Sequence, residues 1–151
     1  MRTTISKAAV FLAISLTFIM TSAEASASHN VRKLAGTWDI QGQPEPTCGV
    51  QPFRNFTSIS REGKIINSDP EVGTGVGEAY RMGRGKYAAG FFGFISDNGT
   101  ILSYEVQGTL ELLDAGHFTG IFRATVFDPA GNPACTYEGT MEGYRLVPMP
   151  Y

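Results

Sequence analysis

Apolar and polar residues alternate along most of the chain, and the clearest case runs from Ile101 to Leu113. Successive residues of a strand point to opposite faces, so this period predicts a strand with one buried and one solvated face. Clusters of Gly, Asn, Asp and Pro separate the alternating segments, and no long segment has the period of a helix. The chain is therefore predicted to be all-β.

The alternating segments follow one another at short spacing and number eight. The predicted strands cover residues 34–41, 53–60, 64–67, 76–82, 86–95, 101–113, 118–127 and 135–147. Tight turns between them, such as Asp97-Asn98-Gly99, favour antiparallel neighbours. Eight sequential antiparallel strands can close into an up-and-down barrel, which removes free sheet edges. We predict such an eight-stranded barrel as the single domain of residues 28–151.

The N-terminal segment has a different composition. Arg2 and Lys7 precede an apolar stretch from Ala8 to Met20, and small residues end the segment at Ala27. This order predicts a secretory signal peptide over residues 1–27. The apolar stretch would reach only ~20 Å as a helix, short of the ~30 Å hydrocarbon core of a membrane. We therefore expect a secreted or periplasmic protein with no membrane span after signal removal.

Closure of the barrel makes two predictions about side-chain pairs. The first and last strands become antiparallel neighbours, so Cys48 lies near Cys135 and Trp38 lies near Arg145. Two cysteines in an exported chain favour one disulfide, which we assign a structural role. A guanidinium over an indole contributes ~1 to 2 kcal/mol where it is partly desolvated. Trp38 and Arg145 are expected to stabilise the end of the barrel opposite the cysteines.

Composition and charge exclude several classes of protein. Hydrophobic residues make up 42% and charged residues 17% of the chain, which excludes a polar disordered protein. Twelve Lys and Arg against fourteen Asp and Glu leave no basic excess for nucleic acid. The sequence contains no His-Glu-x-x-His, no phosphate-binding loop and no paired Cys-x-x-Cys, so we expect no metal and no cofactor. It leaves the oligomeric state open.

A short motif carries a family resemblance. Gly36-Thr37-Trp38, taken with Arg145, resembles the Gly-x-Trp and Arg pairing of the calycin barrels, above all the lipocalins. The glycines from Gly73 to Gly77, followed by the segment 87–92, are similar to the small allene-oxide-cyclase-like barrels. Both resemblances imply a small β-barrel that holds a molecule in its lumen.

Strand parity places a set of aromatic and polar residues inside the barrel. An aromatic lumen with a few hydroxyls suits a small hydrophobic or aromatic ligand, although the same rings could instead fill a solid core. The predicted ligand-binding residues are Tyr80, Phe91, Tyr104, Phe122, Tyr137 and Met141. Our first hypothesis is a secreted protein that binds such a ligand.

Two further hypotheses belong to other classes. The resemblance to allene-oxide-cyclase-like barrels implies an isomerase or cyclase, in which Glu78 would act with Tyr80, Tyr104 or Tyr137 as acid and base. A secreted protease-inhibitor-like interaction protein would use the loop 43–51 or the N-terminal arm 28–33. Fold alone cannot choose among these functions.

Overall fold

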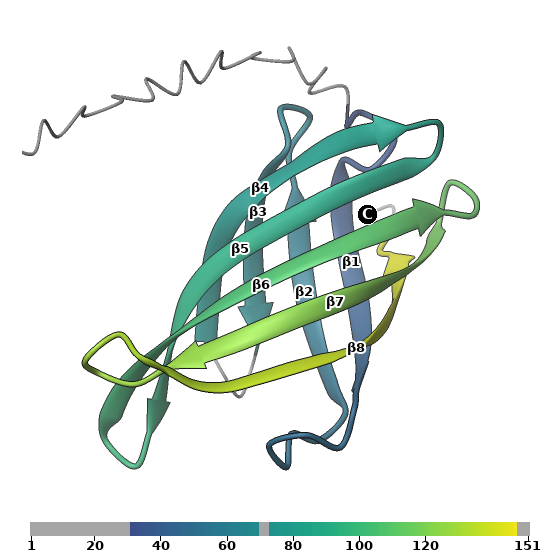
Figure 1. The fold of residues 1–151 in the computed structure, drawn as a ribbon. Coiled ribbons are helices and arrows are strands. Elements are labelled where there is room, and N and C mark those ends of the chain that lie inside the picture. The colour runs from purple at the N-terminus through teal and green to yellow at the C-terminus, as the bar shows by residue number, and fades with distance from the viewer. Residues whose placement is uncertain (1–30, 70–72, 148–151) are drawn as a thin grey trace, which may run out of the picture.

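The alternating segments form antiparallel strands that close into a barrel in the computed structural model, which describes residues 31–69 and 73–147 (Figure 1). The described residues contain eight strands: β1 (Gly36–Pro44), β2 (Phe53–Ile59), β3 (Lys64–Asp69), β4 (Gly73–Gly83), β5 (Lys86–Asp97), β6 (Thr100–Leu112), β7 (His117–Phe127) and β8 (Pro133–Arg145). Each strand pairs with its neighbours in the sequence, and β8 pairs with β1. The predicted fold class is confirmed, and the strand order is that of a calycin-like barrel. The expected signal peptide lies outside the described residues.

The seam between β1 and β8 closes the barrel in the predicted register. Trp38 pairs directly with Arg145, and Pro44 at the other end of β1 pairs with Gly139. Just beyond this end, Cys48 and Cys135 form a disulfide across 6.2 Å between their Cα atoms. Two segments that are 87 residues apart in the sequence are thus joined, as the closure predicts.

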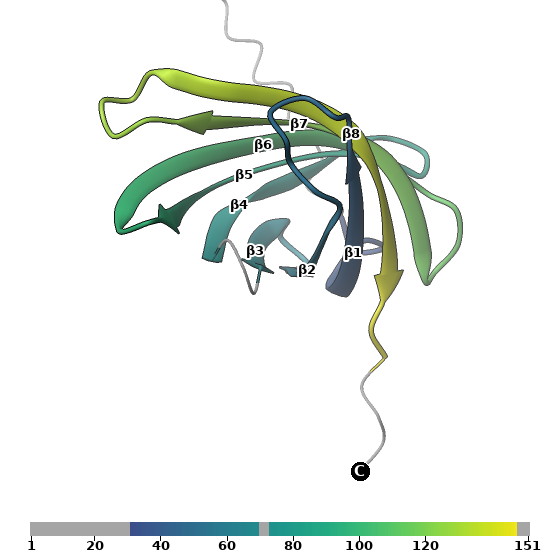
Figure 2. The same cartoon turned by 90° about the horizontal axis from the view of Figure 1, so that it is seen from below.

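The wall of the barrel is uneven in length. Strands β5, β6 and β8 contain 12, 13 and 13 residues, whereas β2 and β3 contain 7 and 6. The β5–β6 and β7–β8 hairpins therefore project beyond the short strands (Figure 2). Figure 1 shows these hairpins and the β1–β2 loop spread apart at one end, which we call the open end. No helix in the described ranges is long and apolar enough to cross a membrane.

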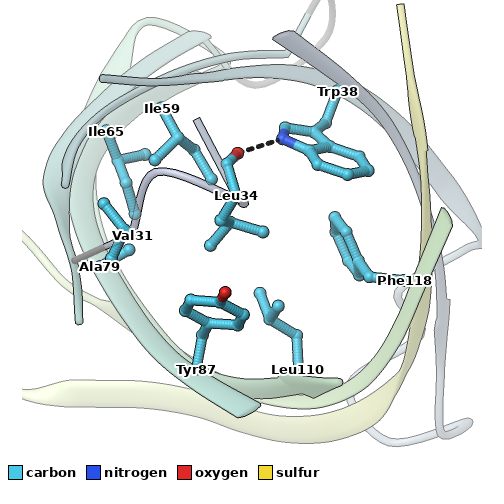
Figure 3. Packing of buried hydrophobic residues seen from close by; sticks show 9 residues of the cluster. All are labelled: Val31, Leu34, Trp38, Ile59, Ile65, Ala79, Tyr87, Leu110 and Phe118. Carbon is cyan, nitrogen blue, oxygen red and sulfur yellow. Dashed lines mark hydrogen bonds between the residues drawn. The ribbon is translucent and has the colours of Figure 1, made fainter. Parts of the chain in front are cut away.

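The opposite end is closed by a dense apolar core (Figure 3). Nine buried residues form this cluster: Val31, Leu34, Trp38, Ile59, Ile65, Ala79, Tyr87, Leu110 and Phe118. Val31 and Leu34 are fully buried although they lie in a turn before β1. The amides of Leu34 and Ala35 donate to the Val31 carbonyl and hold this turn across the barrel. The apolar character of Leu34 predicted that it belongs to the first strand, and this prediction is wrong. Leu34 lies before β1 and closes the barrel end instead.

Arg145 fixes the N-terminal turn to the last strand. Its guanidinium lies over the Trp38 ring, 4.3 Å from the centroid, which confirms the predicted pair. The guanidinium also donates to the carbonyls of Lys33 and Ala115, each at 2.6 Å, and to that of Ala35. The Trp38 indole N–H donates to the Leu34 carbonyl at 2.7 Å. One cation thus satisfies three carbonyl groups, two in the N-terminal turn and one in the β6–β7 loop.

Candidate functional site

Polar side chains are buried inside the barrel above the apolar core. Asn55 and Thr57 from β2 and Asn67 from β3 are each less than 7% exposed. The Thr57 hydroxyl lies 2.7 Å from Oδ1 of Asn67 and 3.3 Å from Oδ1 of Asn55. Buried polar groups need hydrogen-bond partners, and these three residues supply one another. We call them the inner polar cluster.

Tyr104 from β6 brings a phenol to this region. Its side chain is buried at 6% exposure, and its hydroxyl has no hydrogen-bond partner among the described residues. Asn67 lies near the hydroxyl, but not in hydrogen-bonding geometry. Gly93 makes this position possible, because a Cβ atom there would lie 2.5 Å from the Tyr104 hydroxyl oxygen. The hydroxyl is thus held in the lumen without a hydrogen bond of ordinary geometry to the described residues.

Aromatic rings line the rest of the open half. Phe122 meets Phe53 edge to face at 5.5 Å between centroids and Tyr137 at 6.1 Å. Phe91 meets the Tyr104 ring at 6.1 Å, also edge to face. Such ring pairs are stabilising in themselves, and together they present apolar walls around the polar groups.

The electrostatic surroundings keep both phenols protonated at neutral pH. Burial raises the pKa of Tyr104, nearby Asn67 lowers it, and the Asp69 carboxylate raises it further. Burial also raises the pKa of Tyr137, with additional contributions from Asp69 and Tyr104. A protonated phenol donates a hydrogen bond. Two donors therefore lie in the same part of the lumen, close enough to influence each other's ionisation.

Solvent reaches the open half of the lumen but not the closed half. Inward side chains of the closed half, such as Trp38 and Phe118, are fully buried. By contrast Phe53, Phe91 and Tyr137 face inward and are only partly buried. The rings of Phe53, Phe91 and Tyr137 are thus partly exposed, whereas Tyr104 and Phe122 in the same half are buried and the closed end is sealed.

The structure sorts the predicted site residues into three places. Phe91, Tyr104, Phe122 and Tyr137 come together in the open half, as strand parity predicts. Met141 also faces inward, but it packs against the apolar core of the closed half. The prediction that Glu78 and Tyr80 of β4 point into the lumen is wrong.

Glu78 and Tyr80 lie on the outer face of β4 rather than in the lumen. The Glu78 side chain is 60% exposed and pairs with Lys64 of β3, and Tyr80 is 45% exposed. Between them Ala79 is fully buried and points inward. The acid and base set expected for a cyclase is therefore not assembled around Glu78.

The inner polar cluster is the part of the site that sequence reasoning missed. Phe53, Asn55, Thr57 and Ile59 occupy alternate positions of one strand and all face inward. Two polar residues between two apolar ones on one face are the signal that could have revealed the cluster. No group of three or more metal-ligating side chains occurs within residues 31–69 and 73–147.

Comparison of the chain with protein-family models and with curated proteins finds no match. The calycin-like assignment therefore rests on the closed eight-stranded order and on the contact between Trp38 and Arg145.

Proposed function

We propose that the protein binds a small molecule in the open half of its barrel, with an apolar or aromatic body and an oxygen atom that accepts a hydrogen bond. The observation that carries this proposal is the buried Tyr104 hydroxyl without a partner among the described residues. Leaving a buried donor unsatisfied costs roughly 1 to 3 kcal/mol, so natural structures rarely do it without a reason. A ligand oxygen placed at this hydroxyl would remove the penalty.

The surroundings of Tyr104 support the same ligand chemistry. Phe91 and Phe122 offer apolar surfaces, and Tyr137 offers a second phenol that is protonated at neutral pH. The site has no fixed positive charge among these residues, which favours a carbonyl, ether or hydroxyl oxygen over a carboxylate. This would be a lipocalin-like use of the barrel, with the ligand entering between the loops of the open end.

Binding without chemistry fits the residues better than the other two hypotheses. With Glu78 on the outer face, a cyclase would have only Tyr104 and Tyr137 from the set expected for acid and base chemistry. An inhibitor-like protein could use the loop 43–51, but the N-terminal arm 28–33 contains Val31, which is fully buried in the core. The ligand-binding role is therefore the one we propose.

We further propose that the protein works outside the cytoplasm, in a secreted or periplasmic form. The disulfide between Cys48 and Cys135 supports this, because such bridges persist in oxidising compartments. The composition of residues 1–27 supports it from the sequence.

A pair of matched probes tests the ligand chemistry. We would measure binding of 2-acetylnaphthalene, an aromatic ketone, and of 2-ethylnaphthalene, a hydrocarbon of similar shape, by equilibrium dialysis. The ketone should bind more tightly than the hydrocarbon. Replacing Tyr104 by Phe removes only the hydroxyl, so the dissociation constant of the ketone should rise about five- to tenfold while that of the hydrocarbon stays unchanged.

Tyr80→Phe is the control, because it removes the same atom from the outer face. It should leave the affinity for both probes unchanged. Without ligand, Tyr104→Phe should be as stable as the wild-type protein or more stable, since it deletes an unsatisfied buried group. Equal loss of ketone binding in both variants, or no binding of either probe by the wild-type protein, would overturn the proposal.

A further inference from the structure

A half-buried carboxylate, Asp69, lies on the inner face of β3 at the open end. It occupies an alternate position of this strand with Ile65 and Asn67, which are 3% and 2% exposed and point inward. Successive inward residues of a strand lie ~7 Å apart, so Asp69 is one such step nearer the open end than Asn67. Its cross-strand partner on β4 is Gly73, which has no side chain to shield the carboxylate from that strand. Asp69 therefore brings a negative charge to the open half of the lumen.

The Tyr104 hydroxyl reaches the same wall from β6. Tyr104 pairs with Gly93 of β5, and Gly93 pairs with Gly75 of β4. Gly75 in turn pairs with Asn67, which completes a row across four strands. Cβ atoms on Gly75 and Gly93 would lie 3.0 and 2.5 Å from the Tyr104 hydroxyl oxygen. The phenol thus extends over two glycines toward β3, in a row one inward step from Asp69.

The charge of Asp69 acts on both phenols of the lumen. It raises the pKa of Tyr104 and that of Tyr137 on β8. A carboxylate has about four acceptor sites, so hydrogen bonds to neighbouring groups leave its charge in place. The inward residues of the open half within the described ranges include no Lys or Arg. Arg54 and Arg123 lie on the outer face, each in an ion pair with a carboxylate. The interior of the open half is therefore negative, which favours a cation over an anion.

Aromatic rings supply a second means of holding a cation in the lumen. The Phe91 and Tyr104 rings meet edge to face at 6.1 Å between centroids, and the Phe122 and Tyr137 rings do the same. Phe91 and Tyr137 are only partly buried, so a ligand can contact them. The face of an aromatic ring attracts an ammonium group, and several rings together recognise methylated ammonium groups. The rings and the carboxylate thus favour the same kind of charge.

We propose that the ligand of the open half is an aromatic ammonium compound, whose cationic nitrogen lies beside Asp69 while an oxygen accepts the Tyr104 hydrogen bond. This inference rests on the proposed function and adds the charge of the ligand. The two positions differ by ~7 Å along β3, a span that one benzene ring between the oxygen-bearing group and the nitrogen covers. A ligand with a carboxylate in place of the ammonium group would be repelled by Asp69.

Two ketones that differ only in charge test this proposal. The first, para-trimethylammonioacetophenone, has a permanent positive charge, and the second, para-tert-butylacetophenone, has the same shape with carbon in place of nitrogen. In equilibrium dialysis, the wild-type protein should bind the ammonium ketone at least about fivefold more tightly than the neutral ketone. Asp69→Asn keeps the shape of the side chain and removes its charge. It should weaken binding of the ammonium ketone about five- to tenfold and leave the neutral ketone unchanged.

Glu105→Gln is the matched control for the loss of one negative charge. Glu105 follows Tyr104 on β6 and therefore points to the outer face, where it accepts a hydrogen bond from Gln107 at 2.6 Å. This variant should keep the wild-type preference for the ammonium ketone. Far-ultraviolet circular dichroism should show the same β-sheet spectrum for all three proteins. The comparison of the two ketones on the wild-type protein needs no variant, so it tests the proposal even if Asp69→Asn does not fold.

The possible results separate this inference from the proposed function. The neutral ketone can bind in a Tyr104-dependent manner while the ammonium ketone binds no more tightly. In that case the lumen site stands and its preference for a cation is refuted. An equal loss of ammonium binding in Asp69→Asn and Glu105→Gln would also overturn the inference, because net charge alone would then explain it. Binding of neither ketone would overturn both proposals.

Discussion

Alanine substitution of Trp38 and Arg145, singly and together, measures how much the contacts at the closed end contribute to the unfolding free energy of the barrel. Trp38 is fully buried, contacts the Phe118 ring at 5.0 Å between centroids and donates to the Leu34 carbonyl. Truncation of a buried aromatic residue to Ala typically costs ~3 to 5 kcal/mol of unfolding free energy. Trp38→Ala should lie at the upper end, because it also leaves the Leu34 carbonyl unsatisfied.

Arg145→Ala removes less apolar packing than Trp38→Ala does. It removes hydrogen bonds in addition to the contact with the indole ring. The contact with the indole contributes ~1 to 2 kcal/mol. Three donated hydrogen bonds are lost as well, and two of them are at exposed positions where water can replace the donor. We therefore expect a total cost of about 3 kcal/mol for Arg145→Ala, with a coupling to Trp38 of ~1 to 2 kcal/mol.

Urea unfolding followed by far-ultraviolet circular dichroism is the suitable assay, because Trp38 is the only tryptophan and its variant loses tryptophan fluorescence. Arg123→Ala is the control, since Arg123 forms an exposed ion pair on the outer wall. It should change the unfolding free energy by less than ~1 kcal/mol. If the costs of the two single variants add to that of the double variant within ~0.3 kcal/mol, Trp38 and Arg145 do not interact and the reasoning is refuted.

Three further predictions concern groups that titrate or cross-link. Asp39 accepts hydrogen bonds from Arg54 at 2.6 and 2.8 Å, and these bonds lower the pKa of the Asp39 carboxyl. They therefore stabilise the fold above about pH 4, and this stabilisation is lost as the pH falls below that value. In urea unfolding between pH 6 and 3, Asp39→Asn should lose less unfolding free energy than the wild-type protein. The raised pKa of Tyr104 means that its ionisation destabilises the fold as pH rises through and beyond about 10, and phenolate absorbance should lose a late-titrating group in Tyr104→Phe. Reduction of the Cys48–Cys135 bridge should lower the unfolding free energy by up to ~4 kcal/mol, and an unchanged urea midpoint would contradict a structural role.

Strand number, order and closure could be predicted from the sequence because each rests on local information. Alternation defines the strands, and short turns such as Asp97-Asn98-Gly99 make neighbours antiparallel. With eight such strands, closure follows from the need to pair the first edge with the last. The pairing of Cys48 with Cys135 and of Trp38 with Arg145 then follows from geometry.

The face of β4 that points into the barrel could not be predicted, because the larger apolar residues of this strand lie on its outer face. Val76, Tyr80 and Met82 face solvent, whereas Gly75, Gly77 and Ala79 face inward. The interior at this strand is occupied by side chains from its neighbours. A Cβ atom on Gly77 would lie 2.6 Å from that of Phe91, and one on Gly75 would lie 3.0 Å from the Tyr104 hydroxyl. Small residues are required there, so the usual rule that the larger apolar face is buried gives the wrong face.

The N-terminal turn was missed for a related reason. Val31 and Leu34 are apolar residues beside a clear strand pattern, and local alternation extends that strand to include Leu34. Their burial depends on a barrel end that needs to be filled, which is a property of the whole fold. The inner polar cluster likewise depends on contact between β2 and β3, and a single strand does not show that Thr57 meets Asn67.

The contacts of Arg145 have a consequence for the order in which this chain can fold. Arg145 lies on the last strand, yet it donates hydrogen bonds to the carbonyls of Lys33 and Ala35, which lie 112 and 110 residues earlier in the sequence. Contacts between residues so distant in sequence form slowly, because a long loop has to close first. Until β8 has been synthesised, β1 and β7 are unpaired edges that can bind other chains. A ribosome-bound chain lacking its last strand is thus the most aggregation-prone form of this protein, and its protection during synthesis matters more than for a helical protein of equal size.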